Sequence, residues 1–257
     1  MTVALAVGCA VLGLVVGSFL SVLVERVPHK APILSRRSHC PSCDADLAGR
    51  DLVPVVSWLA RRGRCRACSE RISVRYPVLE LGCAAIFAAT ALRFGLDYPL
   101  PAYLVLGAAL VALSAIDIEH KLLPNKIIYP TGYAVAVLLL LAALAQAEPR
   151  RIGWAAIGGI GSFAMFFGLH LLSPNGMAFG DVRLSLVLGM AVGWLGLGQV
   201  PVFLFVAFLT SATVGVVYAV LSGKGLKAAI AFGPFLALGA EVTIFFGQPL
   251  VDAYLGA

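Results

Sequence analysis

Charged residues are scarce in this chain of 257 residues. Asp, Glu, Lys and Arg make up 12% of it and hydrophobic types 60%, with a mean hydropathy of +0.95. A typical soluble domain has about 25% charged residues. So few charged side chains cannot cover a protein surface that faces water. We therefore expect lipid to cover most of the surface of this chain. A disordered chain, a cytosolic globular protein and a nucleic-acid-binding arm are excluded.

The positive charge is confined to one segment. Residues 25–77 hold eleven Lys or Arg and five Asp or Glu, whereas the rest of the chain holds eight of each. The whole net charge of +6 therefore lies in 53 residues between apolar stretches. Basic segments beside membrane spans usually stay in the cytoplasm, so we expect this segment to be cytoplasmic. A nucleic-acid patch is the weaker alternative.

Long uncharged runs divide the remainder into helices. A spanning helix needs about 20 mostly apolar residues, and charges, prolines and glycines interrupt such runs. The pattern predicts an all-α polytopic membrane protein with about eight transmembrane helices. The break inside the run 184–223 rests on Gly196, Gly198 and Pro201 alone. The expected spans are 3–24, 78–95, 100–118, 127–147, 152–172, 182–198, 201–222 and 228–247.

The basic residues also orient these spans. With residues 25–77 inside, alternating crossings place sixteen basic residues inside and three outside, as the positive-inside rule requires. Residues 1–24 lack a basic n-region and are too long for a cleaved h-region, so we expect a retained first span and both termini outside the cytoplasm. The outside residues are Arg93, Arg150 and Arg151; inside, beyond residue 77, are Lys121, Lys126, Arg183, Lys224 and Lys227.

Two C-x2-C pairs lie in the basic segment, namely Cys40 with Cys43 and Cys65 with Cys68. Each pair offers two thiolates from one tight turn, and together they complete a tetrahedral site. Four soft thiolates favour zinc or an iron centre, and the absence of other redox signals favours zinc. A closed shell of four thiolates leaves no place for water, which indicates a structural site. Metal binding would contribute roughly 10 kcal/mol to folding this small insert.

The cysteines have alternative interpretations. Two disulfides conflict with a reducing cytoplasm, and a pair of redox motifs lacks the βαβ context. His39 is a possible substitute ligand beside the first pair. Cys9 and Cys83 fall inside apolar spans and are expected to be small buried hydrophobic residues.

Acidic residues in or at the ends of spans are candidates for function, because a buried carboxylate is costly unless it is neutral, paired or facing water. Asp117 ends the third expected span and Asp181 begins the sixth, on the same side of the membrane. Two carboxylates in a partly dry site share a proton. One then takes a proton from water while the other protonates a carbonyl oxygen. Gly180, which precedes Asp181, allows a substrate backbone to approach closely.

Each acid also has a purely structural interpretation, for example Asp181 paired with Arg183 or capping a helix. Glu80 and Glu241 have no partner that spacing reveals. A proton-coupled transporter with a zinc-stabilised loop would use Asp117 and Asp181 as a relay, so the residues alone leave the reaction class open.

The motifs together resemble one family, the bacterial type IV prepilin peptidases, also called prepilin leader peptidase/N-methyltransferases. The resemblance covers most of the chain in the right order, and both aspartate motifs belong to it. Its other parts are Gly17-Ser-Phe-Leu-Ser-Val-Leu-Val-Glu-Arg-Val-Pro28, Cys40-Pro-Ser-Cys43, Asp51-Leu-Val-Pro-Val-Val-Ser-Trp-Leu-Ala-Arg-Arg-Gly-Arg-Cys65-Arg-Ala-Cys68 and Ile72-Ser-Val-Arg-Tyr-Pro-Val-Leu-Glu80-Leu.

The resemblance implies an inner-membrane aspartic protease of the Gly-x-Gly-Asp type with Asp117 and Asp181 as its catalytic pair. Such enzymes cut the leader from prepilins and pseudopilins of type IV pilus or type II secretion systems, after a glycine and on the cytoplasmic face. Many then methylate the new N-terminus with S-adenosylmethionine, an activity associated with the cysteine segment. A non-enzymatic pilus-assembly scaffold is a third hypothesis.

The implied organisation is a first transmembrane helix at 1–24, a cytoplasmic zinc-binding segment at 25–77 and a protease domain at 78–257. The implied partners are the substrates and the bilayer, without nucleic acid. Two positions depart from the family pattern. Ala178 replaces the first glycine of the second aspartate motif, and Ser21 replaces an asparagine. The added methyl group should leave proteolysis intact, whereas the lost amide bears on methylation.

Overall fold

The computed structural model describes residues 2–32, 39–40, 42–173, 177–222 and 230–255. The chain divides into two compact units, Met1–Leu96 and Asp97–Ala257. The described residues form helices and no strands, apart from two isolated bridges in the first unit, His39 with Asp46 and Arg64 with Arg71. The predicted all-α class is therefore confirmed for the part of the chain that the structure describes.

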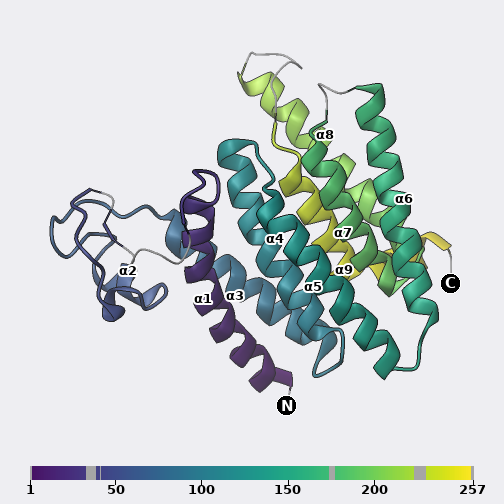
Figure 1. Ribbon diagram of the computed structural model, residues 1–257, viewed down its shortest axis with the longest axis horizontal. Helices are drawn as coiled ribbons and strands as arrows, with labels where there is room; N and C mark the ends of the chain where they lie inside the picture. Colours follow the sequence, from purple (N-terminus) through teal and green to yellow (C-terminus); the bar gives the residue numbers. More distant parts are fainter. Residues whose placement is uncertain (1, 33–38, 41, 174–176, 223–229, 256–257) are drawn as a thin grey trace. The chain divides into compact units, whose positions relative to one another are not determined.

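The first unit is built on two long helices that pack side by side, α1 (Thr2–Arg26) and α3 (Arg75–Phe94) (Figure 1). Their backbones approach closely at two glycines of α1. A β-carbon at Gly17 would lie 2.6 Å from the Cα of Glu80, and one at Gly13 would lie 2.7 Å from the Cα of Ala84. Between α1 and α3 lie the short helices η1 (Gly49–Asp51) and α2 (Val56–Ala60).

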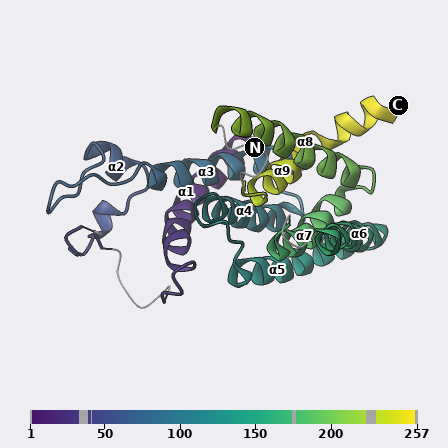
Figure 2. The same cartoon turned by 90° about the horizontal axis from the view of Figure 1, so that it is seen from above.

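In the part that the structure describes, the second unit is a bundle of six helices. The shortest, α7, is the most enclosed: eleven of its 17 residues are buried, and it packs against α5, α6, α8 and α9 (Figure 2). The contact with α6 is close because Gly158 on α6 meets Gly189 and Gly193 on α7. The six helices are α4 (Leu100–His120), α5 (Asn125–Ala145), α6 (Arg150–Leu172), α7 (Phe179–Leu195), α8 (Gln199–Ser222) and α9 (Gly233–Leu255).

The eight expected spans correspond to α1 and to α3 through α9. Seven of these helices are long and apolar enough to cross a membrane; α7 falls short because it has only 17 residues. The break expected inside the run 184–223, between the spans 182–198 and 201–222, is confirmed but lies slightly earlier, since α7 ends at Leu195 and α8 begins at Gln199.

The expected bounds of the last span, 228–247, are wrong at the C-terminal end, because α9 continues to Leu255. The helix begins at Gly233, and the proline that follows suits a first helical turn, where no backbone N–H is required. Residue 228, Lys224 and Lys227 lie outside the described residues.

The outer faces of the helices are apolar. On α1, for example, Val3, Val7, Val11 and Val15 are all more than half exposed, and only three residues of α8 are buried. Exposed apolar faces of this extent indicate contact with lipid.

Candidate functional sites

Two helix ends position the acids of the second unit. Asp117 lies in the last turn of α4, which ends where Lys121 adopts a left-handed conformation, with φ of 52°, and donates its N–H to the Asp117 carbonyl. Asp181 lies in the first turn of α7. Both are buried, at 5% and 4% exposure. The structure thus brings together two acids that are 64 residues apart in the sequence.

Both acids line one cavity of about 230 Å³. Its walls come from the connection between α4 and α5 and from the beginning of α7, and two basic side chains, Lys121 and Arg183, also line it. The remaining lining residues are Leu122, Leu123, Pro124, Asn125, Ala178 and Gly180. Such a space holds water and an extended backbone but no large cofactor.

The hydrogen bonds of the two carboxylates differ. Asp117 Oδ2 accepts a 2.9 Å bond from the backbone N–H of Gly233, the first residue of α9. Asp181 Oδ1 is buried and has no hydrogen-bond partner among the described residues. Arg183 instead donates to Asn125 Oδ1 at 2.7 Å and lies over the ring of Phe179. The structure therefore gives no support to the interpretation of Asp181 as the ion-pair partner of Arg183.

The structure gives Gly180 a packing role that the sequence did not indicate. A β-carbon on Gly180 would lie 2.8 Å from Cβ of Leu123. The glycine therefore allows the connection between α4 and α5 to approach the start of α7. Close approach of a substrate backbone at Gly180 stays a prediction.

Ala178 fits its position without strain. It precedes α7 with φ of −72° and ψ of 142°, an extended conformation that any L-residue adopts. The position does not require a glycine here.

The four cysteines of the two C-x2-C pairs converge. All four sulfur atoms lie within 4.8 Å of one another, and Cys40 Sγ is 3.9 Å from Cys68 Sγ. Four thiolates at ~2.3 Å from one tetrahedral ion would be ~3.8 Å apart, so the cluster suits a metal. None of the six cysteines forms a disulfide, and His39 is not part of the cluster. As expected, Cys9 and Cys83 are buried.

The two cysteine turns have the same backbone pattern. In the first, Cys40 N–H donates to the Ala45 carbonyl and the Cys40 carbonyl accepts from Asp44 N–H. In the second, Cys65 N–H donates to the Glu70 carbonyl and the Cys65 carbonyl accepts from Ser69 N–H. Asp44 and Ser69, which occupy the same place in the two turns, both have a positive φ.

The second turn also directs backbone N–H groups toward its first sulfur. The N–H groups of Cys68 and Ala67 lower the pKa of the Cys65 thiol to about 7. A thiolate, the form that binds metal, is therefore accessible at neutral pH.

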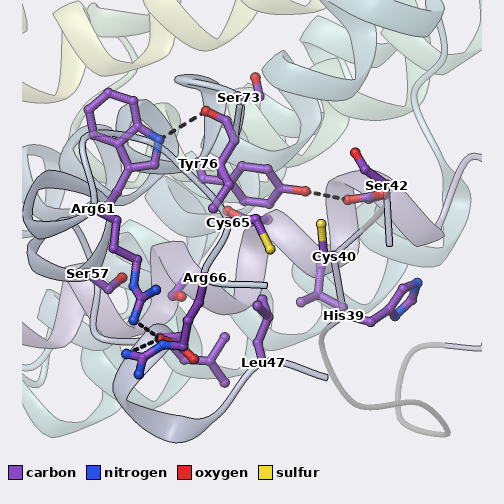
Figure 3. A pocket seen from close by; sticks show the side chains of 18 of the residues that line it. His39, Cys40, Ser42, Leu47, Ser57, Arg61, Cys65, Arg66, Ser73 and Tyr76 are labelled. Carbon is purple, nitrogen blue, oxygen red and sulfur yellow. Dashed lines mark hydrogen bonds and ion pairs between the residues drawn. The ribbon is translucent and has the colours of Figure 1, made fainter. Parts of the chain in front are cut away.

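A larger cavity, of about 700 Å³, lies in the first unit beside the cysteine cluster (Figure 3). It is lined by the C-terminal part of α1, the beginning of α3 and the chain between them. Arg61 and Arg66 converge there on one carboxylate oxygen of Asp51, at 2.7 Å and 3.1 Å. The Tyr76 hydroxyl donates to Glu25 Oε2 at 2.9 Å. This volume is in the range of cofactor and small-molecule sites.

Glu80 has a partner that spacing did not reveal. Glu80 is 7% exposed and lines the larger cavity. Glu80 Oε2 accepts a 2.7 Å bond from the backbone N–H of Val55, a non-glycine residue with φ of 60°. Such a conformation is costly for a β-branched residue.

The fold and the sites define a multi-pass helical membrane protein with paired acids at two helix ends and a cysteine cluster. Residues 11–94 match the bacterial peptidase A24 N-terminal domain, and residues 104–220 match the type IV leader peptidase family. The chain belongs to the type IV leader peptidase family and is an enzyme.

Curated relatives agree with this assignment. The prepilin leader peptidase/N-methyltransferase of Stutzerimonas stutzeri is 31% identical over 96% of this chain and 93% of its own. The type 4 prepilin-like proteins leader peptide-processing enzyme of Escherichia coli O78:H11 (strain H10407 / ETEC) is 34% identical over 91% of each chain. A prepilin leader peptidase/N-methyltransferase of Bacillus subtilis (strain 168) is 30% identical over 95% of this chain and 96% of its own. No solved structure matches. The transporter alternative gains no support.

Proposed function

We propose that the chain is an aspartic endopeptidase that removes the leader from type IV prepilins or pseudopilins after a glycine, with Asp117 and Asp181 as its catalytic pair. The observation that carries this proposal is the single cavity lined by both buried carboxylates.

The chemistry follows from two carboxylates in a small, partly dry space. They cannot easily both ionise, so one retains a proton. The ionised carboxylate takes a proton from water, whose oxygen attacks the scissile carbonyl carbon, while the protonated one donates to the carbonyl oxygen. The C–N bond then breaks as the amine leaves with a proton. The bond from Gly233 N–H fixes the orientation of the Asp117 carboxylate throughout.

The active site would face the cytoplasm of a bacterial inner membrane. Lys121 and Arg183 line the cavity of the two acids, and basic residues concentrate on the cytoplasmic side of membrane proteins. The leader, which precedes the apolar part of a prepilin, would then be cut on the side where it is synthesised.

The first unit would supply a second activity, N-methylation of the new N-terminus with S-adenosylmethionine. Support comes from the names of the relatives, which include N-methyltransferase, and from the cavity of about 700 Å³. Its polar and aromatic lining, with Trp58 and Tyr76 beside charged groups, suits a donor that carries both a flat base and charges. Cys40, Cys43, Cys65 and Cys68 would hold a structural zinc ion beside it.

The test is to incubate the purified chain with a prepilin, with and without S-adenosylmethionine, and to measure product masses. We expect Asp117→Asn and Asp181→Asn each to lower cleavage by roughly 100-fold to 10,000-fold while the protein still accumulates in membranes. Glu119→Gln is the matched control, because Glu119 is a half-exposed acid at the same helix end. Cleavage that survives in either aspartate variant would reject the pair, whereas a wild-type chain that yields no cleaved product would reject the peptidase function itself.

A further inference from the structure

The larger cavity of the first unit has an uneven distribution of charge. Arg61 and Arg66 are paired with Asp51. On the α1 side, Arg26 donates to the Pro32 carbonyl at 3.3 Å. Glu25 and Glu80 also line the cavity, and among the described residues neither has an ion-pair partner. Arg64 and Arg71 line the cavity as well, but no described cation forms an ion pair with Glu25 or Glu80.

Only one of the two carboxylate oxygens of Glu80 has a hydrogen-bond partner among the described residues. Val55 N–H binds Oε2 at 2.7 Å, whereas Oε1 has no hydrogen-bond partner in the described part of the chain. A buried acid costs free energy unless its oxygens find partners, and Glu80 is only 7% exposed. The bond from Val55 N–H and the close contact of Gly17 with the Glu80 backbone both hold this acid at the cavity wall.

Glu25 lies in the last turn of α1 and is exposed. The Tyr76 hydroxyl donates to Glu25 Oε2 at 2.9 Å (Figure 3), which fixes the carboxylate and leaves Oε1 available. An exposed acid with a fixed orientation suits a group that arrives from outside, whereas the buried Glu80 suits a ligand that is enclosed.

We propose that these two carboxylates bind the two reacting groups of the methylation reaction. Glu80 faces the sulfonium of S-adenosylmethionine, and Glu25 binds the α-amino group of the cleaved substrate. The proposal rests on the proposed N-methyltransferase function and adds to it the residues that recognise each reactant.

The charge balance of the reaction fits this arrangement. The acceptor enters as a neutral amine after losing a proton to water; its nitrogen lone pair forms a bond to the methyl carbon as the carbon–sulfur bond breaks. The sulfonium becomes a neutral thioether and the amine a methylammonium. The positive charge thus passes from the group beside Glu80 to the group beside Glu25, and one cation is near the two acids before and after transfer.

The test separates the two acids by ligand binding on the purified full chain. We expect Glu80→Gln to weaken S-adenosylmethionine binding by roughly 10-fold to 100-fold, because a charged partner is lost. Binding of S-adenosylhomocysteine, which lacks the sulfonium charge, should change less than about threefold. Glu25→Gln should raise KM for a cleaved pilin peptide roughly tenfold and leave binding of the methyl donor unchanged. Glu70→Gln is the matched control, since Glu70 is an exposed acid of the same unit outside the cavity.

Each outcome has a defined meaning. Equal loss of both adenosyl ligands in Glu80→Gln would show a merely structural role and overturn the proposal for that residue, as would unchanged binding. Unchanged KM in Glu25→Gln and in Tyr76→Phe would overturn it for Glu25. If the wild-type chain cleaves prepilin but neither binds nor uses the methyl donor, the proposed second function itself is wrong. Retained binding of S-adenosylhomocysteine shows that the first unit of a variant is folded; if Glu80→Gln fails to accumulate, Glu80→Asp takes its place.

Discussion

The two cavities of this chain differ in size and in the way their acids are held. The cavity in the second unit measures about 230 Å³ and has its two acids at the ends of long apolar helices. The cavity in the first unit measures about 700 Å³ and is lined largely by the polar chain between α1 and α3. The smaller space suits hydrolysis, which needs only water and a peptide bond, and the larger one suits a reaction with a bulky second reactant.

The difference also indicates what stabilises each site. The helix ends that carry the acids of the second unit also carry buried apolar side chains, such as Ile116 and Val182. Packing therefore fixes these helix ends, and the bond from Gly233 N–H orients Asp117. The chain between α1 and α3 contributes few buried residues besides Cys40, Cys65 and Gly63. A bound metal would therefore supply much of the stability there.

Loss of the metal is the change that we expect to separate the two regions most, because it should affect one activity and not the other. Cys40→Ser should reduce zinc from about one ion per chain to well below it and abolish methyl transfer, while leader cleavage persists. Elemental analysis and product masses measure these results on the same preparation. Cys9→Ser, at a buried cysteine outside the cluster, is the control. Equal metal content in both variants would contradict the four-thiolate site.

A smaller effect, on leader cleavage rather than on methyl transfer, is expected from a substitution at Gly233. A β-carbon there would lie 2.7 Å from Asp117 Oδ2 and would displace the carboxylate. Because misplacement of a catalytic group by ~1 Å can cost ~100-fold, Gly233→Ala should lower kcat for cleavage roughly 10-fold to 100-fold with little change in KM or in methylation. Gly161→Ala is the control, since a β-carbon at Gly161 meets nothing within 4 Å. Wild-type kcat in Gly233→Ala would show that this contact does not position Asp117.

The smallest effect is expected at Ala178. Its extended conformation suits alanine and glycine alike, so Ala178→Gly should leave the cleavage rate within about twofold. Glycine gives the unfolded chain greater conformational freedom, which should lower the free energy of unfolding by about 0.4–1 kcal/mol. Thermal unfolding of the detergent-solubilised protein would detect this change. A large gain in cleavage would mean that the methyl group restricts the site.

Much of the helical framework follows from the sequence because bilayer thickness sets the length of apolar runs. The turn before Gln199 and the convergence of two cysteine pairs were both predictable, since each depends on local spacing. The bounds of α7 were less predictable: the helix has the 17 residues expected for 182–198 but lies three residues earlier, at Phe179–Leu195, because packing within the bundle sets its ends.

Contacts between distant residues account for what sequence reasoning missed. The bond between Gly233 N–H and Asp117 joins residues 116 apart, and that between Val55 N–H and Glu80 joins residues 25 apart. No periodicity signals either contact. The only sequence signals were a glycine at a helix start and an acid without an obvious partner.

The enclosure of α7 by four neighbouring helices has a consequence for the substrate. For a substrate that reaches Asp181 by the proposed mechanism, α5, α6, α8 and α9 would obstruct a lateral approach along α7. We expect the scissile bond to enter endwise, in an unwound stretch of the substrate, so that the place where its own helix begins sets the position of the cut.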